Sequence, residues 1–240
     1  MPDGDDGSVA PPFLLPSAGP DPLPADVALA AVRGYQHGLR PLRFRPPGDR
    51  GGRWVEVPAF GWARCDLLPT GTDDADLLAA EGLHGRLDPA GWAAAADALT
   101  RLRPVVDAAV DRAAGRAFGD LPDDEVSVLG EPGTVGAALR AVQQEQLFPH
   151  VSAALHHRHP ALVPHVDRVT RLQLLPHLEE GDSDLHAVVH RELRVNAGPF
   201  AALAAATGAT PLRLHDVLVW LSGSLRLTHA VALGRRGAQW

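Results

Sequence analysis

From Thr72 onward, apolar residues recur at the three- and four-residue spacing of a helix, and prolines and glycines interrupt the pattern at short intervals. Each segment can then bury one stripe in a shared core, whereas a sheet would need alternating faces. The spacing predicts helices at about 73–80, from Pro89 through a break or kink at Pro104, and at about 133–147, 150–158, 162–175, 183–194, 199–206 and 211–221. We therefore expect a mainly α fold.

The N-terminal part of the chain has a different pattern. Residues 1–24 include seven prolines together with glycine and aspartate, a composition that blocks helices and ladders, so we expect a disordered tail there. Asp26 can cap a helix that ends near Gly34 or Gly38. Apolar and polar residues then alternate on both sides of a turn-rich link, which predicts a β-hairpin over about 42–57. We expect residues 25–240 to form a single α-rich domain, a helical bundle with this small N-terminal hairpin.

The charge of the chain is unevenly distributed. The net charge is −7, yet residues 1–139 hold 12 Arg against 21 acidic residues, while residues 140–240 hold 10 Arg against 8. The acidic total argues against bulk binding to nucleic acid or to an anionic membrane. Ten of the twelve histidines lie in the second half, which can still present a basic, histidine-rich surface. All 22 basic residues are arginine, so Schiff-base, PLP and P-loop chemistry, which need a lysine, are excluded.

Cysteine usage and the N-terminal sequence bear on the cellular compartment. Cys65 is the only cysteine, so the chain cannot form an internal disulfide or a thiolate metal cluster. The first residues are acidic where a signal peptide would be basic, and no run approaches the ~18 apolar residues of a membrane span. We expect a cytoplasmic protein with no membrane partner.

The densest polar cluster lies around Pro160. A predicted helix ends just before it, in the side chains of His156, His157, Arg158 and His159. Positive groups suit the exposed carbonyls of a helix end, and Asp167 suits the first turn of the next helix, so helix capping alone explains both placements. Asp216 lies one turn before Trp220 on a helix that Thr210 can cap. Asp216 either faces solvent while Trp220 packs in the core, or is buried with a cationic partner, because its apolar neighbours would make an unpaired carboxylate costly.

This cluster resembles an uncharacterised bacterial family, a domain of unknown function, in which Leu-His and basic residues precede Pro-x-Leu-x-Pro-x-x-Asp. The matching positions here are Leu155, His156, Arg158, Pro160, Leu162, Pro164 and Asp167. Ala153 stands where the family has a lysine. The segments 73–78 and 214–220 are also similar to the family, so the resemblance covers roughly residues 70–225. It implies a shared fold and a shared site, and no activity.

The same segment is faintly similar to the helix-hairpin-helix DNA glycosylases, in which a Val-Asp pair opens a helix and the aspartate is catalytic. Val166 and Asp167 provide such a pair. The valine and arginine that follow fall one residue early, however, the glycine hairpin is missing, and a lysine nucleophile does not exist. A motif without its structural context does not carry the activity over.

A metal site is a further hypothesis. His186 and His190 share one helical face, and imidazoles suit Zn, Fe and Ni. Ala187 occupies the position of the glutamate in the zinc-protease motif, and spacing supplies no third ligand. We predict that this pair holds no metal and that the chain needs no cofactor.

The sequence leaves open whether the chain is an enzyme. We expect a non-enzymatic or cryptic ligand-binding protein with a basic, histidine-rich centre, whose partner is an anionic ligand or nucleic acid. The alternative is a metal-dependent hydrolase that uses the histidines of the second half. The candidate ligand-binding residues are His156, His157, Arg158, His159, Asp167 and Asp216. We also predict that Arg158 pairs with Asp216, or with Asp167 in its place, as a clasp between two helices.

Overall fold

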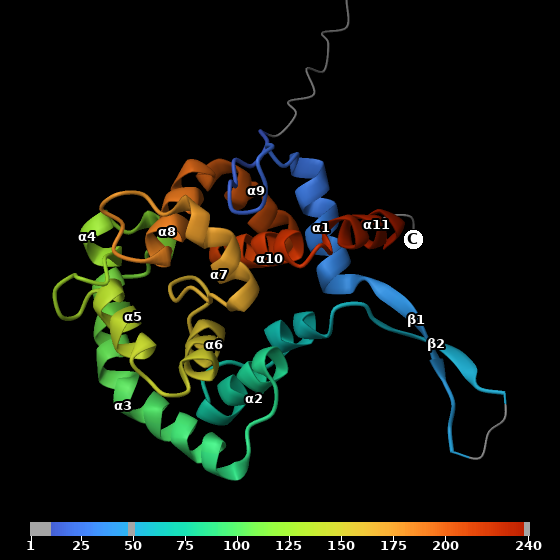
Figure 1. Cartoon of the computed structure of the whole chain (residues 1–240), viewed down its shortest axis with the longest axis horizontal. Coiled ribbons are helices and arrows are strands. Elements are labelled where there is room, and N and C mark those ends of the chain that lie inside the picture. The colour runs from blue at the N-terminus through green and yellow to red at the C-terminus, as the bar shows by residue number, and fades with distance from the viewer. Residues whose placement is uncertain (1–10, 48–50, 238–240) are drawn as a thin grey trace, which may run out of the picture.

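The computed structural model describes residues 11–47 and 51–237. Helices pack around a central helix, and a two-stranded hairpin stands out on one side (Figure 1). The predicted fold class, mainly α with a small hairpin near the N-terminus, is confirmed. Residues 1–10, part of the predicted disordered tail, lie outside the described residues.

Short connections join the elements along the described chain. In order they are α1 (Ala25–His37), β1 (Leu39–Phe44), β2 (Arg53–Pro58), η1 (Gly61–Leu67), α2 (Asp73–His84), α3 (Pro89–Ala113), η2 (Phe118–Asp120), α4 (Asp123–Val126), α5 (Val135–Gln143), α6 (Phe148–Arg158), α7 (Arg168–Leu174), η3 (Leu175–His177), α8 (Leu185–Val195), α9 (Ala197–Thr207), α10 (Pro211–Gly223) and α11 (Leu227–Gly237).

Caps determine where several helices begin. Thr210 caps α10 as predicted, with its hydroxyl accepting the backbone N–H of Arg213. The predicted helix at 162–175 begins only at Arg168, because the side chain of Asp167 accepts the N–H of Thr170 and so acts as the cap. α3 runs through Pro104 as one helix of 25 residues, so this proline does not break it.

α10 is the centre of the core. Every residue from Leu212 to Leu221 on it is buried, including its charged ones. The helix packs against α1, α7, α8, α9 and α11. Since a helix surrounded on all sides cannot place a charge in water, its polar side chains must find partners inside the protein.

α1 and α11 lie closer together than ordinary side chains allow (Figure 1). A Cβ atom on Gly34 would lie 1.8 Å from the carbonyl oxygen of Ala230, and one on Gly234 would lie 1.8 Å from that of Ala30. Only glycine fits at these two crossing points, because the backbones themselves are in contact. The pair therefore joins the first and last helices of the chain.

The prediction of a disordered tail through residue 24 is wrong for residues 11–24. Phe13 and Leu15 are buried in the core, and Phe13 forms an isolated β-bridge with Leu23. Proline excludes helix and ladder here, but it does not prevent a loop from burying its apolar side chains. The Phe13 ring packs edge-on against Phe200 at a centroid distance of 5.0 Å.

Polar contacts also fix this segment to α8 and its end. The Ser17 N–H donates to Oε1 of Glu192 at 2.9 Å, and the Ser17 hydroxyl donates to Oε2 at 2.6 Å. His215 lies on the other side of Glu192, with Nε2 2.6 Å from Oε2. Asn196 accepts the N–H of Leu14 and donates to its carbonyl. A loop of irregular backbone is thus attached to the helical core by side-chain hydrogen bonds.

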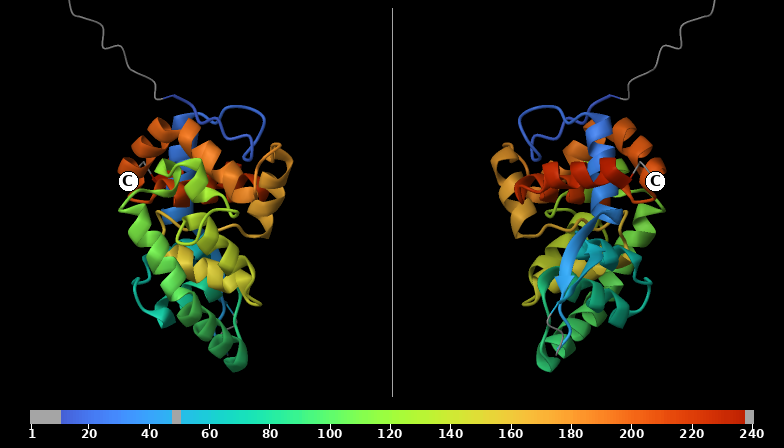
Figure 2. Two further views of the ribbon diagram at one scale, coloured as in Figure 1. Left: turned by 90° about the vertical axis from the view of Figure 1, so that its left-hand side faces the viewer. Right: turned by 90° about the vertical axis from the view of Figure 1, so that its right-hand side faces the viewer.

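The hairpin has the opposite character. β1 and β2 pair antiparallel from Leu39 opposite Pro58 to Phe44 opposite Arg53, close to the predicted 42–57. All six residues of β1 are exposed, and the hairpin projects from the helical body in Figure 1. In the right-hand view of Figure 2 the hairpin lies on the side that faces the viewer. Regular backbone hydrogen bonds hold it, rather than burial.

None of the helices in the described part of the chain is by itself long and apolar enough to cross a membrane. Among residues 11–47 and 51–237, one pair of consecutive helices, α10 and α11, reaches that length and composition together, with a bend of 119° between them.

Candidate functional site

A cavity of about 620 Å³ lies where the ends of several helices meet. Its wall takes residues from the end of α2, the end of α5, the start of α6, α7, η3 and the start of α8. The apolar part of the wall consists of Phe148, Pro149, Val166, Leu175, Leu178 and Leu185. The polar part consists of His84, Gln143, Asp167, Arg168, Arg171, Asp184 and His186. This size suits a small organic molecule.

Asp184 is already committed to structure. It caps α8 by accepting the N–H of His186 at 2.9 Å, it accepts the amide of Gln143 at 2.9 Å, and it contacts the His186 ring. Burial would raise the pKa of Asp184, but the hydrogen bonds from His186 and Gln143 outweigh burial and the pKa is lowered. This carboxylate therefore stays ionised and occupied.

The two arginines of α7 are available. Arg168 and Arg171 are exposed and lie one helical turn apart, so their side chains leave the same face of the helix. Neither side chain forms a hydrogen bond or an ion pair within the described part of the chain. The unused charge at this cavity is consequently positive.

A second, much smaller cavity of about 20 Å³ shares His84 and Asp167 with the larger one. It is about large enough for one water molecule. Tyr35, His165, Arg213, Asp216 and Trp220 complete its polar and aromatic lining.

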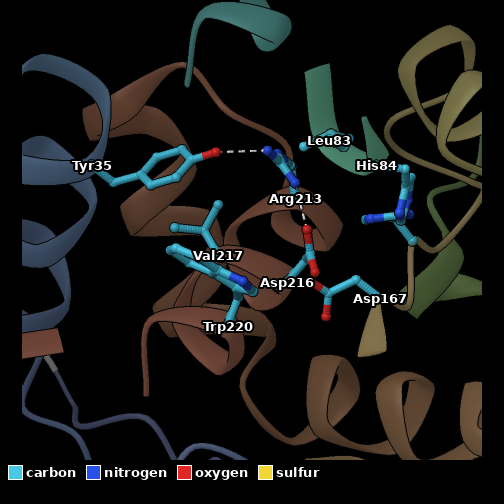
Figure 3. A pocket seen from close by; sticks show the side chains of 9 residues that line it. Tyr35, Leu83, His84, Asp167, Arg213, Asp216, Val217 and Trp220 are labelled. Atoms are coloured by element: carbon cyan, nitrogen blue, oxygen red, sulfur yellow. Dashed lines mark hydrogen bonds and ion pairs between the residues drawn. The ribbon is translucent and has the colours of Figure 1, made fainter. Parts of the chain in front are cut away.

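Arg213 organises the polar lining of this small cavity (Figure 3). Its guanidinium pairs with Asp216 one turn along α10, donates to the Tyr35 hydroxyl at 2.8 Å and reaches Asp66 at 3.1 Å. Three partners for one buried cation satisfy the requirement that a buried charge be paired and hydrogen-bonded. The expected cationic partner of Asp216 thus comes from its own helix, at a spacing of three residues.

The carboxyl of Asp216 lies beside that of Asp167 in Figure 3. Burial, opposed by Arg213 and reinforced by Asp167, raises the pKa of Asp216 to about 6. Burial likewise raises the pKa of the Tyr35 hydroxyl, with Arg213 opposing. Asp216 can thus gain or lose a proton near neutral pH, while Tyr35 stays a neutral phenol.

Four imidazoles form a row beside the two cavities. The ring centroids are 5.4 Å apart for His150 and His84, 5.1 Å for His84 and His165, and 5.9 Å for His165 and His156. Burial is the main reason why the pKa values of His84 and His165 are lowered and that of His156 falls to about 3. The buried part of the row is therefore neutral at physiological pH.

Several nitrogens in this region are buried without a hydrogen-bond partner. They are Nε2 of His84, Nε2 of His156, Nδ1 of His165 and Nε of Arg213. Three of these four side chains line the small cavity. Such groups are costly unless a water or a ligand atom satisfies them, so this end of the site is suited to a polar group.

The structure separates the residues that the sequence placed in one centre. Asp167 and Asp216 meet at the small cavity, and His156 lies beside His165. His157 and Arg158 instead face α2, where His157 Nδ1 lies 2.6 Å from Asp76 and Arg158 Nε donates to Asp76 at 2.7 Å.

The predicted clasp is wrong, because Arg158 pairs with Asp76 and with Asp73 at 2.5 Å. His156 and His157 are buried, so they form no surface for a ligand. His159, the C-cap of α6, is half-buried. Its pKa is lowered, mainly by burial and to a smaller extent by the nearby charge of Arg158. The sequence argument did not consider Asp76 as a partner of Arg158, because a carboxylate 82 residues away gives no local signal.

The sequence argument missed His84, His165 and Arg213 as residues of the site. Arg213 had a usable signal, because a cation three residues before a buried carboxylate on one helix is placed to pair with it. His84 had none, since it meets the site only through the packing of α2 against α6.

The predicted absence of metal at His186 and His190 stays a prediction. His186 contacts Asp184, and His190 Nε2 lies 2.8 Å from the carbonyl oxygen of Leu121. Within the described ranges, no group of three or more His, Cys, Asp or Glu side chains is placed to hold a metal ion. Zinc analysis of purified protein and of the His186→Ala, His190→Ala variant is the direct measurement.

Comparison with known proteins identifies one family. The model of a family of unknown function, DUF6308, matches residues 61–223, which contain both cavities except for the contribution of Tyr35. No curated protein and no solved structure matches the chain.

Proposed function

Because this chain belongs to the DUF6308 family, whose function is unknown, we propose a function from the site itself: the larger cavity binds a small organic anion with an apolar body. The observation that carries the proposal is the pair of uncommitted arginines, Arg168 and Arg171, beside an apolar wall. Guanidinium groups recognise carboxylate, sulfonate and phosphate oxygens through paired N–H donors.

The remaining polar groups support an anionic ligand by elimination. Asp184 is used by Gln143 and His186, and Asp167 is used as the cap of α7. His84 is neutral because burial lowers its pKa. The apolar side chains across the cavity, such as Leu178 and Leu185, suit a hydrocarbon or aromatic body.

We further propose that the ligand carries a second polar group, besides its anionic group, and that this group enters the small cavity. His84 and Asp167 belong to both cavities, so a group that reaches past them meets the partnerless nitrogens of His165 and Arg213. A hydroxyl is of suitable size, because the space is about that of one water molecule.

Two further parts of the proposal concern compartment and chemistry. We place the protein in the cytoplasm, on the support of a single, buried, free cysteine in 240 residues. Binding without catalysis is the activity we propose, and the metal-dependent hydrolase remains the alternative that zinc analysis addresses.

The experiment uses anilinonaphthalene sulfonate as an anionic probe and phenylnaphthylamine as its neutral analogue. We expect saturable binding of the anionic probe to the full chain, weakened about tenfold or more in the Arg168→Gln, Arg171→Gln double variant, which corresponds to about 1.4 kcal/mol. The neutral probe should bind both proteins alike, because it lacks the group that the arginines contact.

Two matched variants complete the design. Arg40→Gln with Arg53→Gln removes the same charge from the hairpin and should leave both affinities unchanged. Leu178→Trp fills the cavity and should weaken both probes. Equal losses of the anionic probe in the two arginine pairs, or binding that survives Leu178→Trp, would overturn the proposal. Near-UV circular dichroism of each variant serves as the control for core packing, because such dyes also bind to proteins whose core has loosened.

A further inference from the structure

The hairpin raises a question that the cavities do not answer, because it exposes apolar and aromatic side chains to solvent. Leu39, Leu42 and Phe44 of β1 are between 40 and 47% exposed, and Trp54 of β2 is 69% exposed. A two-stranded hairpin without a covering layer is marginal in water by itself. Retaining exposed aromatics on such an element suggests that a partner covers them.

The charge of the hairpin indicates what kind of partner that is. Residues 39–58 contain five arginines and two acidic residues, a balance of +3, in a chain whose net charge is −7. The remainder of the chain is therefore strongly acidic and repels polyanions. A basic element that projects from an acidic body offers a polyanion a contact that keeps most of the acidic surface at a distance.

The pairing register shows how the arginines and aromatics are arranged. Phe44 faces Arg53 on one side of the hairpin, with the guanidinium 5.9 Å from the ring centroid. Arg43 faces Trp54 on the other side. Each side of the outer end thus combines a cation with an aromatic ring, the combination that proteins use against phosphates and bases.

We propose that the two strands β1 and β2 form an arm that binds double-stranded DNA through their arginines and their exposed aromatic rings. A two-stranded ribbon has the width that the major groove of B-DNA admits, whereas the major groove of duplex RNA is too narrow. The arginines on the two sides contact the phosphates that flank the groove, and Phe44 or Trp54 contacts the bases or sugars. Contacts of this kind are largely independent of sequence.

This inference does not depend on the proposed function of the cavity. Residues 39–58 lie outside the segment 61–223 that matches the family, and outside the lining of the larger cavity. The arm therefore adds a DNA contact to the family region, and either proposal can fail without the other.

The experiment measures binding of the full chain to a short mixed-sequence duplex by fluorescence anisotropy, between about 50 and 200 mM salt. We expect affinity to fall steeply with salt. Arg40→Gln with Arg53→Gln should weaken binding about tenfold or more at the lower salt and make the logarithmic salt slope less steep by about 2, one for each lost phosphate contact. Trp54→Ala should weaken binding with little change in the slope, because stacking releases no counterions.

Arg86→Gln with Arg140→Gln is the matched control, since it removes two exposed arginines of the body that line neither cavity. It should bind the duplex within about twofold of the unaltered chain. Far-UV circular dichroism and thermal melting show whether the exposed substitutions leave the fold intact.

Four outcomes would overturn the arm. The first is absence of duplex binding at the lower salt, and the second is equal loss in the two arginine pairs. The third is tighter binding of the single strand than of the duplex, which would make the partner an unpaired strand. The fourth is a dimer in light scattering that the Arg40→Gln, Arg53→Gln variant dissociates, with no binding to DNA, which would make the partner a second copy.

Discussion

Residues 11–24 and the hairpin formed by β1 and β2 are close in sequence and opposite in character. The first has no regular secondary structure beyond one β-bridge, yet it buries Phe13 and Leu15 and bonds to Glu192. The second has a full antiparallel ladder, yet every residue of β1 is exposed. The difference teaches that regular backbone hydrogen bonding and attachment to the core are separate properties. An irregular loop can be anchored in the core while a regular hairpin is not.

Two phenylalanine substitutions give the largest contrast. Phe13→Ala should lower the free energy of unfolding by about 3–5 kcal/mol, because it removes a ring that is 1% exposed and packed on Phe200. Phe44→Ala should change it by less than about 1 kcal/mol, since that ring is 45% exposed. Urea denaturation measures both, and similar losses would remove the distinction between the two regions.

A pair of glutamates tests the polar side of the same comparison. Glu192→Gln should lower the free energy of unfolding by about 1–3 kcal/mol. The substitution leaves one oxygen in place of two in a buried site where Oε2 contacts both Ser17 and His215. Glu56→Gln on β2 should stay within about 0.5 kcal/mol. If the two variants melt alike, the Ser17–Glu192–His215 contacts do not hold the loop in place.

The smallest expected effect is a pH dependence confined to the N-terminal loop. Burial would raise the pKa of Glu192, but the hydrogen bonds from His215 and Ser17 outweigh it, so the pKa in the folded protein is lowered. The contribution of Glu192 to stability is then complete above its ordinary pKa and is lost as the pH falls through the folded value.

Hydrogen exchange can detect this loss locally. As the pH is lowered toward and below about 4, the protection of the Ser17 amide, relative to an unstructured peptide at the same pH, should decrease. The amides of β1 should keep their protection over the same range. Parallel loss in both regions before global unfolding would mean that Glu192 does not control the loop specifically.

The sequence predicted the elements that depend on local signals. Thr210 before Pro211 indicated the start of α10, and Pro89 indicated that of α3. The start of α7 was placed too early, because Pro164 was read as the first turn of the helix although Asp167 caps it. The ordered loop at residues 11–24 was missed because its proline content indicates only that helices and strands are disfavoured. Composition does not indicate whether Phe13 is buried in the core.

The candidate site divides along the same line. The apolar neighbours of Asp216 left two alternatives, a solvent-facing carboxylate or a buried one with a cationic partner, and the structure has the second. Arg158 was assigned the wrong partner, because Asp76 is remote in sequence and nothing local connects them. The cavity could not be predicted, since it exists only where the ends of α2, α5, α6, α7 and α8 meet. Pairing across a fold depends on packing, which one sequence does not reveal.

The contact of α1 with α11 has a consequence for synthesis. The ribosome releases α1 long before α11 is made, so the small-residue face around Ala30 and Gly34 has no cover while the chain grows. The carbonyl of Ala18 likewise cannot accept the hydrogen bond of the Ser222 hydroxyl until Ser222, 204 residues later, has been synthesised. Contacts between such distant segments form late. The contacts that hold α1 against α11 are therefore among the last that the growing chain can form.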